Sequence, residues 1–152
     1  MRITLQLAFM LAPLLASIAH ADPSAGIAVS HAWSRATPPG AANGVVYLTI
    51  DNSGADDELL RVESPVADHV EMHNSIMRDG MMEMRPLHTV AIAAKSRVRF
   101  EPGGKHLMLI GVKQQIKEGQ QVPVTLVFKR AGAVHVQAIA AWMGATEEPI
   151  HR

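Results

Sequence analysis

The chain has 152 residues, with 14 basic side chains, 14 acidic side chains and no cysteine. This length is enough for one domain with a buried core and too short for two ordinary domains. The balanced charge does not favour binding to nucleic acid or to an anionic membrane, and the absence of cysteine excludes every mechanism that needs a thiolate.

The first 21 residues have the pattern of a secretory signal peptide. A basic residue, Arg2, precedes a mostly apolar stretch, and Ala19-His20-Ala21 has the small-x-small form of a cleavage site. We therefore expect cleavage after Ala21, export of the protein and no stable membrane insertion of the remaining chain. The alternative is an uncleaved amino-terminal anchor, which Pro13 and the short apolar run disfavour.

The chain after the signal peptide contains many short segments rich in β-branched or alternating apolar residues. In chain order, these expected strands lie around residues 27–33, 44–52, 58–63, 69–78, 81–86, 97–101, 106–112, 122–129 and 134–140. Turn formers separate the segments, and no long stretch keeps the 3.6-residue period of a helix, so the pattern predicts an all-β sandwich or barrel. We expect one domain over residues 22–143 and a short flexible tail over residues 144–152.

One hairpin can be predicted in register, because Asp79-Gly80 favours a two-residue type I′ turn. That turn pairs Arg78 with Met81 and, further along, places His73 and Met84 as diagonal neighbours about 7 Å apart at Cβ. Since side chains alternate between the two faces of a strand, one face of the hairpin carries these residues: His73, Ser75, Met77, Met82 and Met84.

Two histidines and two methionines form a spaced constellation: His73, ten residues, Met84, twenty-one residues, His106, one residue, Met108. Two pairs of ligands on separate strands can close one site where the sheets pack. Imidazole is a borderline ligand and thioether a soft one, so this set suits Cu(I) better than Zn(II), Mg(II) or Ca(II). The position of His106 beside a Pro-Gly-Gly turn predicts an accessible site.

The constellation resembles the motif of the PCuAC family of periplasmic copper chaperones, His-x10-Met-x21-His-x-Met. Four further stretches, which span most of residues 31–113, also resemble that family: AWSRATPPGAANGVVYLTIDNSG, SPVADHVEMH, MRPL and PGGKHLMLIGVK. The resemblance implies a cupredoxin-like Greek-key β-sandwich that holds Cu(I) near its surface. It also implies copper transfer toward the dinuclear copper centre of cytochrome c oxidase, with the copper-bearing subunit or another copper chaperone as partner.

Other residues near the motif receive weaker interpretations. The remaining hairpin methionines, Met77, Met81 and Met82, are interpreted as apolar filling rather than as ligands. His69 is a reserve ligand, and H-x-E-x-H from His69 to His73 allows a zinc site, although the spacing differs from that of the zinc-protease helix. Glu71 and Met72 receive no role, and the two tryptophans, Trp33 and Trp142, are expected to pack, with Trp33 shielding the site if the strands bring it close.

The sequence thus predicts a monomeric Cu(I) metallochaperone that releases its ion by ligand exchange. Copper storage or detoxification and a zinc-binding sandwich remain alternatives, as does a scaffold with no metal. Blue-copper electron transfer is excluded, because it needs a cysteine ligand. We expect no enzymatic activity, since the chain has no G-x-S-x-G elbow, Walker loop or dinucleotide fingerprint.

Overall fold

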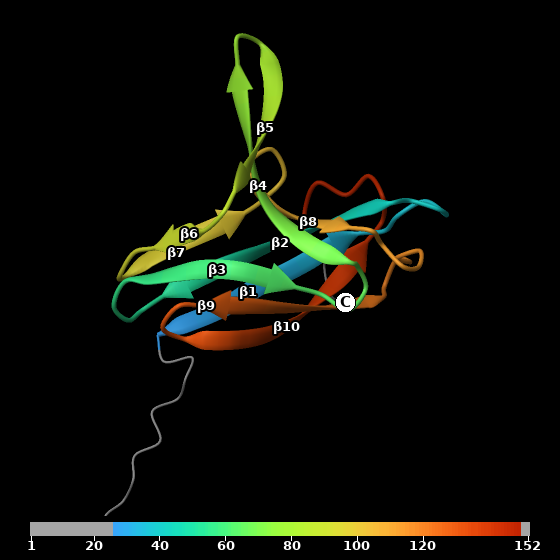
Figure 1. The fold of residues 1–152 in the computed structure, drawn as a ribbon. Helices are drawn as coiled ribbons and strands as arrows, with labels where there is room; N and C mark the ends of the chain where they lie inside the picture. Colours follow the sequence, from blue (N-terminus) through green and yellow to red (C-terminus); the bar gives the residue numbers. More distant parts are fainter. Residues whose placement is uncertain (1–25, 150–152) are drawn as a thin grey trace, which may run out of the picture.

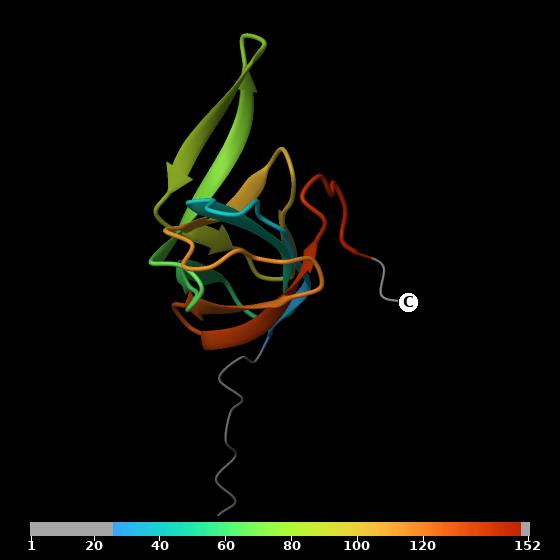
Figure 2. The same ribbon diagram turned by 90° about the vertical axis from the view of Figure 1, so that its right-hand side faces the viewer.

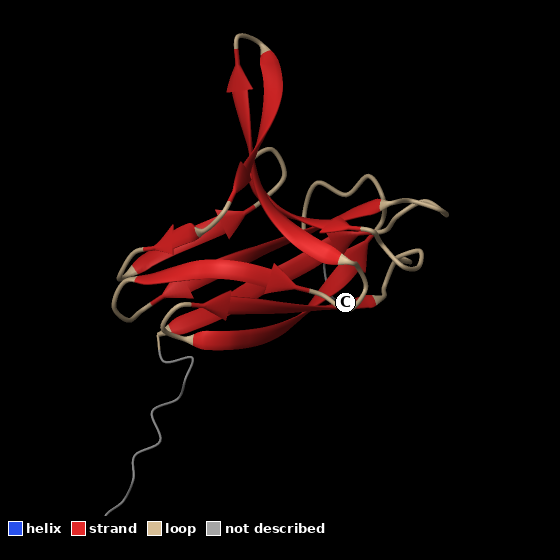
Figure 3. Cartoon of the chain, in the orientation of Figure 1, coloured by secondary structure: helices blue, strands red, loops and turns tan. Residues whose placement is uncertain are grey.

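A computed structural model of the chain describes residues 26–149. Ten β-strands make up the regular structure of these residues, with no helix among them (Figure 3). The strands are β1 (Ile27–Arg35), β2 (Asn43–Asn52), β3 (Asp57–Glu63), β4 (His69–Arg78), β5 (Met81–Leu87), β6 (Val90–Ile92), β7 (Ser96–Phe100), β8 (Lys105–Ile110), β9 (Gln121–Phe128) and β10 (Gly132–Ala141). Residues 26–149 accordingly hold no helix of the length and apolarity that crossing a membrane requires.

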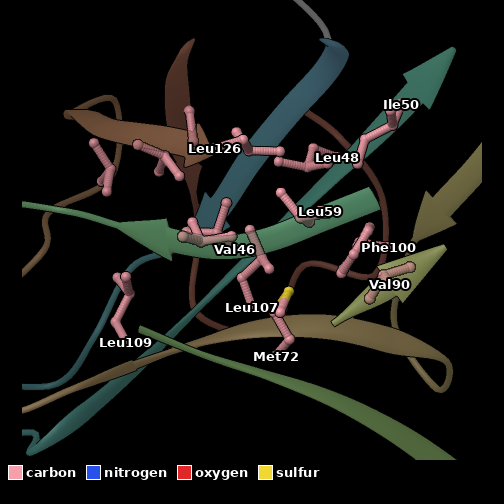
Figure 4. Close-up of a cluster of buried hydrophobic side chains, with 14 of the residues drawn as sticks. Val46, Leu48, Ile50, Leu59, Met72, Val90, Phe100, Leu107, Leu109 and Leu126 are labelled. Carbon is pink, nitrogen blue, oxygen red and sulfur yellow. The ribbon is translucent and has the colours of Figure 1, made fainter. Parts of the chain in front are cut away.

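The strands are hydrogen-bonded in the order β5-β4-β8-β2-β1-β10-β9-β3-β6, and β7 adds to β2. This sheet folds over itself, so that strands far apart in the order enclose one core (Figure 1). Its centre is lined by large apolar side chains that are almost fully buried, as Figure 4 shows: Val46, Leu48, Ile50, Leu59, Leu107, Leu109 and Leu126. The prediction of an all-β sandwich is therefore confirmed.

The β4–β5 hairpin projects from the body of the domain, as both ribbon views show (Figures 1 and 2). Its register is the predicted one, with Arg78 opposite Met81 and Ser75 opposite Met84. The turn residues Asp79 and Gly80 have φ values of 50° and 78°. Both angles lie in the left-handed region that a type I′ turn requires, which explains why this short sequence sets the pairing.

The nine strands expected from the sequence are all present, but β6 was missed. This strand is only three residues long, too short to show an alternating pattern, although Val90 and Ile92 are buried in the core. The segment after β10 contacts the sheet through residue 148: Ala145 is buried, its carbonyl accepts a hydrogen bond from Arg35 Nε, and Glu148 pairs with His31. The predicted signal peptide, residues 1–21, lies outside the described residues.

Candidate metal centre

The predicted ligands lie on three neighbouring strands, β5, β4 and β8. His73 of β4 is directly opposite His106 of β8. Met84 of β5 is opposite Ser75, two residues along β4 from His73, and so lies diagonal to His73 on the same face. The two pairs meet within one sheet, because β4 and β8 are adjacent strands, and not where two sheets pack. Cross-strand neighbours share a face, so the pairing alone brings the two imidazoles together.

The two imidazole rings have the spacing that a shared ion requires. Their centroids are 5.6 Å apart, with ring planes at 83°. A metal bound to one nitrogen of each ring at about 2.0–2.1 Å places the centroids about 5–6 Å apart. The spacing of the two rings thus fits one ion held between them.

Hydrogen bonds set which nitrogen of each histidine is free. His73 Nε2 donates to a carboxylate oxygen of Glu71 at 2.8 Å, and His73 Nδ1 is buried without a hydrogen-bond partner in the described structure. His106 Nδ1 donates to the Gly104 carbonyl at 3.1 Å, which leaves its Nε2 with the lone pair. A buried, unpartnered ring nitrogen is costly unless something binds it, so this arrangement fits a metal ion on His73 Nδ1 and His106 Nε2.

Glu71 is the functional candidate that sequence reasoning missed. It received no role, yet it lies two residues before His73 on the same strand, and the period of two places it on the same face. Its carboxylate accepts from both His69 Nε2, at 3.2 Å, and His73 Nε2. These two hydrogen bonds, that from His69 being the larger cause, hold the pKa of Glu71 below its ordinary value.

The four predicted ligands differ in exposure. His106 is only 7% exposed, so its position beside the turn does not expose its ring. Accessibility comes from Met84 instead, which is 51% exposed on the projecting hairpin. Met108 is half-buried two residues after His106, opposite Glu71 and facing Val45 of β2. Both thioethers are on the histidine face, one toward solvent and one toward the domain.

The remaining hairpin methionines and the two tryptophans differ in exposure and packing. Met77, Met81 and Met82 are exposed, so their interpretation as apolar filling is wrong. Trp33 packs on Tyr47 with ring centroids 4.6 Å apart, which confirms its packing role, but β2 separates it from β8, so it does not cover the site. Trp142 is exposed, contrary to the prediction.

The alternative zinc site receives no support from residues 26–149. His69 lies on the His73 face, as the reserve-ligand interpretation requires, but its Nε2 is bonded to Glu71. Among the described residues, no three His, Asp or Glu side chains are arranged to hold a metal ion. The methionines are thus needed to complete a ligand set around His73 and His106. Ligation by His73, Met84, His106 and Met108 stays a prediction.

The domain matches a known protein family and curated relatives. The family described as "Putative lipoprotein LpqE-like" matches residues 27–140. A "Putative lipoprotein Lxx21020" from Leifsonia xyli subsp. xyli is 30% identical over 105 residues, 68% of this chain and 62% of that relative. The chain spans less than two thirds of the length of the curated relatives it matches.

Two solved structures extend the comparison to copper-bound proteins. The copper-bound PCuAC domain from PmoF2 is 27% identical, with a TM-score of 0.66, covering 77% of this chain and 93% of that domain. The Cu(I) form of DR1885 from Deinococcus radiodurans is 26% identical, with a TM-score of 0.58, covering 82% of this chain and 83% of that protein. These matches confirm the predicted cupredoxin-like sandwich and the resemblance to PCuAC domains.

Proposed function

This chain belongs to the LpqE-like family, and because its structural relatives are PCuAC domains, two of them with copper bound, we propose that it is a Cu(I) carrier. The observation that carries the proposal is the His73–His106 pair, whose rings are 5.6 Å apart and whose Nδ1 and Nε2, respectively, have no hydrogen-bond partner among the described residues. Met84 and Met108 supply the two thioethers on the same face.

The ligand chemistry favours Cu(I) as the cargo. Two imidazoles and two thioethers are neutral and include soft donors, so they suit a soft monovalent ion better than Zn(II). Two hydrogen bonds favour metal binding as well, because Glu71 and the Gly104 carbonyl each fix one imidazole by its other nitrogen. The buried His106 and the partly buried His73 hold the ion, and Met84 faces solvent.

Release follows from the difference in exposure. Met84 is the ligand that an incoming partner reaches first, because it lies on β5 of the projecting hairpin (Figure 2) while His106 is buried. A thiolate or imidazole of the recipient replaces the Met84 thioether, and the ion then leaves Met108 and the histidines in turn. Each step exchanges one ligand for another, so the ion is never without donors and no redox change is needed.

We further propose that the carrier acts after export, in the periplasm. Residues 1–21 resemble a signal peptide, and the family is described as a lipoprotein family. The proposed recipient is the copper-bearing subunit of cytochrome c oxidase or another copper chaperone.

The direct test is an anaerobic titration of the exported protein with Cu(I) in competition with a chromogenic chelator, with Zn(II) as control. We expect one tightly bound Cu(I) and no comparable zinc uptake. Failure to take copper from the chelator refutes the carrier function. Mixing the loaded protein with the soluble copper domain of an oxidase subunit, then separating the two and measuring metal, tests delivery; copper retained by this chain would indicate storage instead.

A further inference from the structure

The β4–β5 hairpin carries more exposed methionine than the proposed site uses. Met77, Met81 and Met82 are 67%, 73% and 58% exposed, and all three lie at the hairpin tip beyond Met84. Large apolar side chains at a projecting tip gain nothing from burial, so packing does not explain them. Their arrangement over the two faces does suggest a use.

The hairpin register separates thioethers from charges. Met77 is directly opposite Met82, and the next pair on the same face toward the domain is Ser75 with Met84, followed by His73. The opposite face carries Met81 and the charged residues Arg78, Glu83 and Arg85. One face of the hairpin is thus an uncharged row of sulfur donors that ends at the histidine pair.

Spacing makes the row continuous for a small ion. Directly opposed residues have Cβ atoms about 4.5–5.5 Å apart, so the Met77 and Met82 thioethers reach one ion between them. Successive residues on one face of a strand are about 7 Å apart, a step that long, flexible methionine side chains can bridge from Met82 to Met84. Thioether sulfur is soft, and no residue of the row from Met77 and Met82 to Met84 is a carboxylate that attracts a harder cation. The carboxylate of this face, Glu71, lies beyond His73.

We infer that Met77 and Met82 form a second, weaker site for a soft monovalent ion, Cu(I), through which the ion enters and leaves the four-ligand site. This inference rests on the proposed function, since the row leads to the His73–His106 pair. The two thioethers bind without charge and without histidine, so the ion resides there briefly and passes to Met84 by ligand exchange.

The experiment is a titration of the exported protein, labelled with ¹³C at the methionine methyl groups, with Cu(I) under anaerobic conditions and NMR detection. The first equivalent should shift the Met84 and Met108 methyl signals. Between one and two equivalents, the Met77 and Met82 signals should shift, and Met81 should not. Met81 is the internal control, because it is equally exposed at the same tip but lies on the other face.

Matched variants complete the test. The double variant Met77→Leu/Met82→Leu should keep the first equivalent, lose the second and take up Cu(I) more slowly, whereas Met81→Leu should behave like the unaltered protein. If the first equivalent binds normally and Met77 and Met82 do not respond, or if Met81 responds as they do, this inference is overturned and the carrier function stands. If Met84 and Met108 fail to respond to the first equivalent, the four-ligand site is refuted and this inference, which leads into that site, falls with it, whereas failure to bind any Cu(I) refutes the carrier function itself.

Discussion

The contact between Glu71 and His73 gives the sharpest prediction about the metal centre. Replacing Glu71 with Gln removes a charge but retains an oxygen that can accept from His73 Nε2, and replacing it with Ala removes the acceptor altogether. The 2.8 Å contact fixes the tautomer that leaves Nδ1 for the ion. Loss of such a partner of a ligating histidine lowers metal affinity by about 10-fold to 100-fold.

The two substitutions should fall at different points of that range. A hydrogen bond to an ionised acceptor is roughly twice as strong as one between neutral groups, so Glu71→Gln should weaken Cu(I) binding by about tenfold. Glu71→Ala should approach a hundredfold loss. The Glu71 contact with His69 is longer, at 3.2 Å, so His69→Ala should have a smaller effect than either.

The assay is Cu(I) competition with a chelator, and Glu83→Gln is the matched control. Glu83 lies on β5 of the same hairpin, pairs with Arg85 at 3.2 Å, and faces away from His73, so the change in net charge is the same without the contact. Thermal unfolding of all variants checks that the fold is kept. If Glu71→Gln and Glu71→Ala bind Cu(I) as tightly as Glu83→Gln, the role of Glu71 in positioning His73 is refuted.

Three further predictions separate the site from the core and test stability. Met84→Leu should weaken Cu(I) binding and should change the free energy of unfolding by less than about 0.5 kcal/mol, because the side chain is half exposed. Chelator competition measures the first effect and urea unfolding the second. An unchanged Cu(I) affinity removes Met84 from the ligand set. Leu107→Ala, on the fully buried face of β8, should cost about 2–5 kcal/mol in urea unfolding; a loss below this range would mean that the core collapses around the missing side chain. Burial raises the pKa of Asp57, but backbone hydrogen bonds, led by that from Arg130, outweigh burial and hold it below its ordinary value. The stability from ionised Asp57 is thus present above about pH 4 and is lost as pH falls through the lowered pKa. In a plot of the urea unfolding midpoint against pH, Asp57→Asn should therefore flatten the slope on the acid side. An unaltered slope would contradict this prediction.

Local sequence was enough for most of the strands and for one pairing. Alternation of apolar residues predicted nine of the ten strands, and Asp79-Gly80 predicted the β4–β5 register residue by residue, because a two-residue type I′ turn leaves the chain one way to pair. Strand β6 was missed since three residues carry no period. The pairing of β4 with β8 was also missed, because no local rule links segments about thirty residues apart.

The features of the candidate metal centre also divide into those that the sequence determined and those that only the tertiary structure decided. By itself, the sequence determined the spacing of His73, Met84, His106 and Met108 and the softness of that donor set. Only the tertiary structure decided that β8 lies beside β4, which places the two imidazoles in contact range and buries His106. It also decided that Met84 and the tip methionines face solvent. Exposure depends on what other strands cover, and among residues 26–149 no strand lies over the projecting end of the hairpin (Figure 1).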